Sequence, residues 1–278
     1  MNKTLFKTIS ILLAFLALAG CSQDETLSQS GGMLLLTRSG DGTDGSSNSL
    51  SPSADYRLLV FDNSTGSQIK NEAFTPGSSR LALEDGTYDI VTLGNMDANA
   101  LTISDATLNA ATVSCKENAT IPMLYHGKGT LTISNGSSTP DTYTAQLEPV
   151  AGTIRLEVTE DQPGRYTYAL NNMYASISLS DGKGTGATKK RSLTNRQTVN
   201  SFPTDGTITL GCSMDGEAEK TFDTGIALEA GKVTTLYLTV EKSEVELTGS
   251  EISAWEDGGT ITDEVTTSHL RQKSIKFK

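Results

Sequence analysis

The chain consists largely of short runs in which apolar and polar residues alternate, with turn residues between the runs. Alternation with a period of two places successive side chains on opposite faces of a strand, so each run predicts a β-strand. Asp-Gly pairs such as Asp85-Gly86 and Asp205-Gly206 suit the tight turns that connect strands. The runs are 56–61, 87–93, 130–134, 143–147, 154–158, 175–180, 207–210 and 236–240. This pattern predicts an all-β protein.

Two segments depart from simple alternation. In the run 56–61, apolar residues occupy both phases, because Leu58 and Val60 alternate with Leu59 and Phe61. This run therefore predicts a strand that is buried on both faces. The segment 97–111 is the best helix candidate because it carries Ala and Leu, although its Thr, Ser and Asn residues lower the helix propensity.

Residues 1–20 have the pattern of an export signal. Two lysines precede an apolar run that is about half the length needed to cross a bilayer. The run ends in Leu18-Ala19-Gly20-Cys21. This is a lipobox, in which small residues fit the signal-peptidase groove and the cysteine thiol accepts a diacylglyceryl group. An ordinary signal peptide with an incidental cysteine, or a short membrane anchor, is the alternative.

Lipidation of Cys21 places the mature chain on a membrane without spanning it. Each buried CH₂ of an acyl chain contributes about 0.8 kcal/mol, so several chains on one residue hold firmly. The polar, acidic stretch 22–25 that follows resembles the signal that sends lipoproteins to the outer surface in some gram-negative anaerobes. A solvated linker is the other interpretation. We expect a surface-exposed lipoprotein of the outer membrane.

Strand spacing and length together predict the domain organisation. Regularly spaced short strands are typical of β-sandwiches, and 278 residues suit two of them. We expect a boundary near Glu148-Pro149, where one set of strands closes and another opens. The expected segments are a signal peptide at 1–20, a linker at 21–32, an N-terminal sandwich at 33–148, and a C-terminal sandwich with a tail at 149–278.

Composition and charge exclude several function classes. The formal net charge is −11, and the chain has only 2 His and 3 Cys. An acidic chain lacks the basic face of a sequence-independent nucleic-acid binder. So few His and Cys residues argue against a metal centre built from them. We expect no cofactor, no metal ion and no nucleic-acid partner.

The sequence shows no constellation that indicates catalysis. His126 and His269 lie far apart in the chain, so we interpret His126 as a polar residue beside a turn rather than as a base. Cys115 and Cys212 are also far apart, and we expect two unpaired thiols. The carboxylates are scattered, and no pair stands out for acid–base chemistry. The chain is predicted not to be an enzyme.

Several segments together resemble the fimbrillin and fimbrial-anchor proteins of type V pili, and this similarity covers most of the mature chain. Each motif is loose, so the resemblance rests on their combination. The segments are the lipobox with its acidic linker, the strand 56–62 ending in Phe-Asp, the Gly-Thr-Tyr strand 86–91 followed by Asn95, the junction 147–158, and the Trp-containing stretch 252–259.

The resemblance implies two tandem transthyretin-like, Greek-key β-sandwiches and a non-catalytic role as anchor, shaft or tip adhesin of cell-surface fimbriae. Shaft and tip subunits of the family are exported as lipoproteins and then cut after an arginine near an N-terminal strand. A donor strand from another subunit fills the groove that opens. The implied partners are other fimbrial subunits, the outer membrane through the lipid, and a host or bacterial surface ligand.

Two segments are candidates for strand exchange. The apolar run 33–38 lies between glycines, is too short for a stable helix and predicts a strand that ends in Arg38. The Gly- and Ser-rich stretch 39–48 follows, so Arg38 is the candidate cleavage site; an incidental arginine after an ordinary first strand is the alternative. An anchor subunit stays uncut and lipidated. The stretch 274–277 fits either the last strand of the domain or a donor segment.

A surface glycan-binding lipoprotein of a polysaccharide-uptake system is the alternative function. Proteins of that class usually expose aromatic side chains that stack on sugars. The single tryptophan, Trp255, belongs to a motif typical of a core. Tyr166 and Tyr168 are the tyrosines that we expect to serve such a role if they are exposed.

Overall fold

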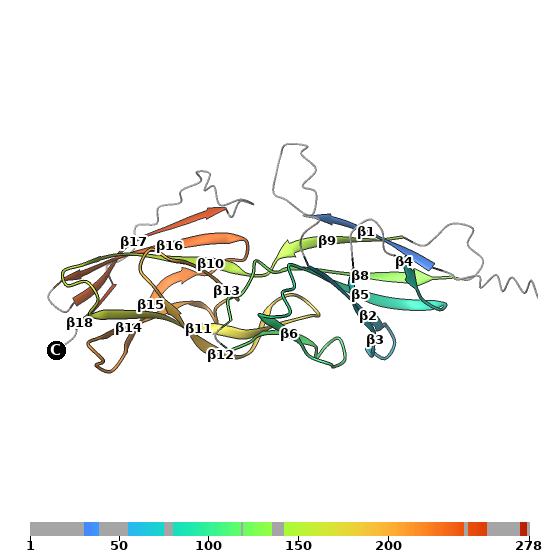
Figure 1. Cartoon of the computed structure of the whole chain (residues 1–278), viewed down its shortest axis with the longest axis horizontal. Coiled ribbons are helices and arrows are strands. Elements are labelled where there is room, and N and C mark those ends of the chain that lie inside the picture. The colour runs from blue at the N-terminus through green and yellow to red at the C-terminus, as the bar shows by residue number, and fades with distance from the viewer. Residues whose placement is uncertain are drawn as a thin grey trace, which may run out of the picture.

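The computed structural model describes residues 31–38, 55–74, 80–117, 119–134, 142–241, 244–254 and 273–276. In these ranges the chain forms eighteen strands and no helix, which confirms the all-β prediction. It follows that the described part has no helix long and apolar enough to cross a membrane. The molecule is elongated, and its strands form two groups that follow one another along the long axis (Figure 1).

The first group forms one hydrogen-bonded path in the order β3-β2-β5-β8-β9-β1-β4. Its strands are β1 (Gly31–Arg38), β2 (Tyr56–Asp62), β3 (Gln68–Phe74), β4 (Arg80–Ala82), β5 (Gly86–Gly94), β8 (Tyr125–Ile133) and β9 (Thr142–Pro149). The runs 56–61, 87–93 and 143–147 lie within β2, β5 and β9, and the run 130–134 lies in β8 except for its last residue.

The path folds back on itself at β8 and β9, where two glycines allow close approach. A Cβ atom on Gly127 would come within 2.4 Å of the Gln146 carbonyl oxygen. A Cβ atom on Gly129 would come within 2.5 Å of the Tyr143 ring. With β9 this close, the small layer β9-β1-β4 lies over the layer β3-β2-β5-β8 (Figure 1).

The second group contains two sheets. A six-stranded sheet runs β15-β14-β11-β7-β6, with β12 on the other side of β11, and a five-stranded sheet runs β13-β10-β16-β17-β18. The first sheet comprises β6 (Leu101–Ile103), β7 (Thr112–Cys115), β11 (Tyr166–Ser178), β12 (Gly184–Leu193), β14 (Thr207–Met214) and β15 (Lys220–Ala227). The second comprises β10 (Gly152–Glu160), β13 (Thr198–Ser201), β16 (Lys232–Glu241), β17 (Glu244–Ala254) and β18 (Lys273–Lys276).

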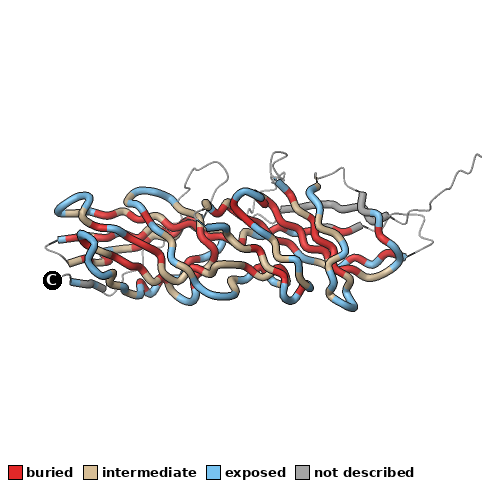
Figure 2. The backbone as a smooth tube through the Cα atoms, turned by 60° about the horizontal axis from the view of Figure 1, so that its bottom comes forward, coloured by how far each residue is buried: buried red, intermediate tan, exposed pale blue. Residues whose placement is uncertain are grey.

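The second group includes strands from before the expected boundary, and a shared core joins it to the first group. β7 precedes the expected boundary near residue 148, yet it pairs with β11 through Ser114↔Ser176 and its neighbours. The hydroxyls of these two serines lie 2.7 Å apart. One hydrophobic cluster extends from Phe61 in the first group to Leu247 in the second. Figure 2 shows buried residues along both groups.

The two-sided burial predicted for the run 56–61 is confirmed. Leu59 and Phe61 belong to the cluster shared by the two groups. Leu58 and Val60 point to the opposite face and belong to a second, smaller cluster. Strand β2 therefore separates two cores, and its side chains contribute to both.

The helix predicted for 97–111 is wrong. The Asp97 carboxylate accepts a hydrogen bond from the Asn99 backbone N–H at 2.8 Å, which favours a turn in place of a helix. The chain then forms β6, which pairs with β7 from Leu101↔Cys115 to Ile103↔Val113. Leu101 is buried in the shared core, so tertiary packing outweighs the weak helix propensity.

His126 lies where the two groups meet. It belongs to β8, only 8% of it is exposed, and its Nε2 lies 2.9 Å from the Leu179 carbonyl oxygen, just after β11. Burial is the largest effect and lowers the pKa of His126, and Lys128 lowers it further. The Leu179 carbonyl, Asp181 and Glu148 act in the opposite direction. The ring is therefore a neutral hydrogen-bonding group between the two groups of strands.

Replacing His126 with glutamine should weaken the dependence of stability on pH. The unfolded chain takes up a proton at the ordinary histidine pKa of about 6.5, whereas the buried ring does so only at lower pH. The neutral ring contributes its full stabilisation above about pH 6.5. This contribution is lost as the pH falls below about 6.5, by at most about 1.4 kcal/mol per pH unit. Urea unfolding at about pH 7.5 and 5 measures this loss, and equal losses in both proteins would contradict the prediction.

Gly127→Ala should destabilise the fold by about 1–3 kcal/mol, the usual cost of an overpacked core. The new methyl group would press on the backbone of β9, which cannot move without disturbing the layer above. Gly249→Ala is the matched control, because its Cβ atom would have its nearest neighbour at 3.6 Å. Free energies of unfolding from urea titrations test both variants. A Gly127→Ala protein as stable as the control would rule out the close contact.

Candidate functional site

Strand β1 lies in the middle of the small layer, between two strands that are distant in sequence. It pairs parallel with β9 from Met33↔Thr142 to Arg38↔Leu147. It pairs antiparallel with β4 from Gly31↔Ala82 to Met33↔Arg80. A parallel neighbour cannot be joined to it by a tight hairpin. The strand predicted from the run 33–38 is therefore present, and it is held by strands that follow it in the chain.

The small layer covers a distinct hydrophobic cluster, named here the β1 cluster. Its buried members are Leu58, Val60, Leu83, Tyr88, Ile90, Leu131, Ile133, Tyr143 and Ala145. Tyr143 and Ala145 come from β9, and Leu83 directly follows β4. Because β1 lies between β9 and β4, it occupies the centre of the layer that closes this cluster.

Tyr143 fixes β9 over the larger layer. Its hydroxyl donates a 3.4 Å hydrogen bond to the Ile90 carbonyl oxygen on β5, and its ring lies against Gly129 on β8. Burial raises the pKa of Tyr143, so the hydroxyl remains a donor at neutral pH. These contacts hold β9 to the rest of the fold independently of β1.

Of the residues singled out in the sequence, some belong to the described part of the chain and others lie outside it. Arg38 is the last residue of β1 and is paired with Leu147. The lipobox Leu18-Ala19-Gly20-Cys21 lies outside the described residues. Trp255 and His269 also lie outside them.

The two remaining cysteines are free thiols, as expected. Cys212 is buried, and burial raises the pKa of its thiol to about 12. Cys115 is partly buried at the end of β7. In the part of the chain that the structure describes, no group of three or more His, Cys, Asp or Glu side chains is placed to hold a metal ion.

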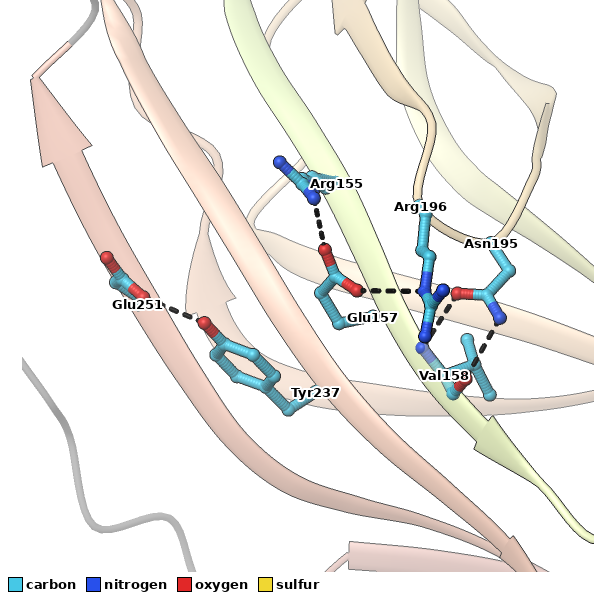
Figure 3. Close-up of polar contacts among 7 residues, drawn as sticks. All are labelled: Arg155, Glu157, Val158, Asn195, Arg196, Tyr237 and Glu251. Carbon is cyan, nitrogen blue, oxygen red and sulfur yellow. Dashed lines mark hydrogen bonds and ion pairs between the residues drawn. The ribbon is translucent and has the colours of Figure 1, made fainter. Parts of the chain in front are cut away.

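The expectation that Tyr166 and Tyr168 are exposed and could stack on sugars is wrong. They are 7% and 5% exposed on β11, and the Tyr168 hydroxyl donates to Glu160 Oε1 at 2.8 Å. The exposed tyrosine is Tyr237 on β16, at 38% (Figure 3). The sequence was sufficient to predict that Tyr237 is exposed, because it alternates in the run 236–240 with Leu236 and the other apolar residues, which point inward.

Comparison with solved structures shows a shared all-β fold. The fimbrial anchor protein Mfa2 from Porphyromonas gingivalis is 16% identical, with a TM-score of 0.58 over 81% of this chain and 97% of that chain. A candidate adhesin from Bacteroides ovatus is 15% identical, with a TM-score of 0.59 over 86% and 95%. A candidate polysaccharide-binding protein from Bacteroides thetaiotaomicron is 12% identical, with a TM-score of 0.56 over 81% and 96%.

Comparison of sequences identifies the family. No curated protein matches the chain. The family described as fimbrillin-A associated anchor proteins Mfa1 and Mfa2 matches residues 30–247, which include β1 and most of both groups of strands. The resemblance seen in the motifs is thereby confirmed. The chain belongs to the family of fimbrillin-A associated anchor proteins.

Proposed function

We propose that this protein is a non-catalytic component of cell-surface fimbriae, as an anchor when uncut, which is the role we favour, and as a subunit joined to its neighbour by β-strand complementation when cut after Arg38. One observation carries the proposal. In a member of a fimbrial anchor family, the first described strand lies between β9 and β4, in a layer whose Tyr143 and Ala145 belong to a separate hydrophobic cluster. The working parts of such a subunit are strand edges and the apolar cluster beneath them.

The topology makes β1 removable. The next strand in the chain, β2, belongs to the other layer, so a cut after Arg38 leaves β1 attached to the fold only through its pairing and packing. Loss of β1 leaves the β9 backbone from Thr142 to Leu147 without its partner. Unpaired backbone groups and uncovered apolar side chains both favour a replacement strand. A donor strand with alternating apolar residues meets both needs.

Lipidation at Cys21 attaches the chain to the membrane, and cleavage after Arg38 would release the fold from it. Cys21, preceded by Leu18, Ala19 and Gly20, lies shortly before β1 in the sequence. A cut after Arg38 therefore separates the fold from its lipid. An uncut chain stays at the outer membrane as an anchor, and a cut chain becomes a released shaft or tip subunit. The anchor role matches the description of the family.

The proposed domain organisation is two transthyretin-like sandwiches, at 33–148 and 149–278, that share the pairing of β7 with β11. The layers of the first group and the two sheets of the second group support this division. The tail contributes β18 to the second sandwich, where it pairs with β17 from Glu244↔Lys276 to Leu247↔Lys273. Lys276 also forms a 3.0 Å ion pair with Glu244. Release of this strand as a donor is the alternative role of the tail.

Mass spectrometry of protein recovered from the native cell surface tests the anchor role. We expect an intact chain with a lipidated Cys21, present in sheared fimbriae. An N-terminus at Ser39 without lipid would instead assign a processed shaft or tip role. An intact, lipidated chain that is never recovered with fimbriae would contradict a fimbrial function altogether.

A strand-exchange experiment tests the removability of β1. Trypsin treatment of the mature chain should cut after Arg38 and allow a fluorescent peptide with the sequence of residues 31–38 to replace β1. Arg38→Ala should block both steps because trypsin needs a basic residue, and Arg38→Lys should retain both. Fluorescence anisotropy measures the uptake of the peptide. A cut chain that takes up no peptide over days would show that β1 does not exchange.

A further inference from the structure

A second surface on the molecule lies away from β1, on the outward face of the five-stranded sheet. Tyr237 and Ile69 are the exposed large hydrophobic residues of the described chain, at 38% and 47%. Ile69 lies on β3, at the edge of its sheet. Tyr237 lies on β16, which is flanked by β10 and β17, so its ring is presented on a broad sheet face (Figure 3).

The Tyr237 ring is held in place and, among the described residues, is open on the side of its partner in β17. Its hydroxyl donates a 2.8 Å hydrogen bond to Glu251 Oε2 on β17. The residue paired with it on β17 is Gly249, which has no side chain. The register shifts immediately after this pair, so Thr248 is an extra residue, and its hydroxyl donates to the Tyr237 carbonyl oxygen at 3.1 Å. Such β-bulges commonly re-aim side chains next to functional sites.

A fixed carboxylate lies on the other side of the ring. Glu157 on β10 is the residue paired with Tyr237 across the parallel ladder. Arg155 forms an ion pair with Glu157 Oε1, and Arg196 Nε lies 3.7 Å from Glu157 Oε2. Both oxygens therefore face a guanidinium group (Figure 3). The carboxylate and its two partners form a polar cluster whose orientation is set before any ligand arrives.

Arg196 adopts a conformation that needs outside support. Its φ angle is 61°, in the left-handed region that costs energy for a residue with a side chain. Its backbone N–H donates to the Leu156 carbonyl oxygen at 2.7 Å. The neighbouring Asn195 amide both donates to and accepts from the Val158 backbone, each at 2.9 Å. β10 thus holds a strained residue that directs its guanidinium group toward Glu157.

We propose that this face binds a sugar ring of a surface glycan. The C–H face of the sugar stacks on Tyr237, its hydroxyls donate to Glu157 and Glu251, and its oxygens accept from Arg155 and Arg196. A sugar combines an apolar face with a rim of donors and acceptors, and this surface presents the matching pattern of one aromatic ring among fixed charges. Tyr237 and Glu157 are also held by their neighbours before binding, as a selective site requires.

Other occupants fit this face less well. A protein partner needs an apolar centre, but the residues that flank Tyr237 in the outward phase of β16 are Thr235 and Thr239. A nucleic acid needs excess positive charge, whereas the two arginines here face Glu157. A polyhydroxylated ligand makes use of both the ring and the carboxylates. This binding role is independent of strand complementation at β1.

The test is a glycan array that covers host and bacterial oligosaccharides, probed with the mature chain, followed by calorimetric titration of the strongest hit. We expect Tyr237→Ala to weaken that binding at least tenfold, because stacking is lost. Tyr237→Phe should remain within about threefold of the native chain, since the ring is kept. An array with no bound glycan would overturn the proposal.

A second tyrosine provides the matched control. Tyr174 on β11 also donates its hydroxyl to a carboxylate, Asp205 Oδ1, at 3.0 Å, but it lies on the other sheet. Tyr174→Ala should leave glycan affinity unchanged, and circular dichroism checks that both alanine variants are folded. A Tyr237→Ala chain that is folded and binds as tightly as the Tyr174→Ala chain would also overturn the proposal.

Discussion

The architecture depends on the pairing of β11 with strands that come from both sides of the expected boundary near residue 148. Tyr166–Leu170 pair with β14 in the C-terminal part of the chain, and Ser176–Ser178 pair with β7 from the N-terminal part. This ladder ties residues 112–114 into the second group, and the shared core joins that group to the first. Swinging the two groups apart would expose apolar side chains of this core to water, so the core opposes bending between them.

The division of the N-terminal core into two clusters limits what the proposed removal of β1 would open. Leu59 and Phe61 face the shared core, whereas Leu58 and Val60 face the β1 cluster. Loss of β1 opens only the second cluster, because β2 and its neighbours form a wall between the two. The opening is therefore local, in the way that subglobal unfolding exposes one cooperative unit and leaves the rest intact.

Much of the fold was predictable from local pattern, and the remainder depends on contacts between distant segments. Alternation located β2, β5, β8, β9, β10, β11, β14 and β16 but not strands such as β3, β12 and β15, and apolar residues in both phases identified β2 as buried on both faces. No local signal specifies that β1 pairs parallel with β9 or that β7 joins β11, because these pairings depend on the tertiary arrangement. The phase that contains Tyr166 and Tyr168 faces the core for the same reason. Tyr237 was predictable, since its apolar neighbours in β16 fix which phase points inward.

The joint between the groups also fixes the direction of the Tyr237 face. The β1 layer belongs to the first group and the Tyr237 face to the second, and they lie in different parts of the long axis (Figure 1). The two groups are connected by a shared core, and His126 of the first group forms a hydrogen bond with the Leu179 carbonyl of the second. In the proposed strand complementation, a donor strand seated on β9 would therefore set how the rest of the subunit is oriented. It would also set which way the Tyr237 face points, while the chemistry of each surface stays separate.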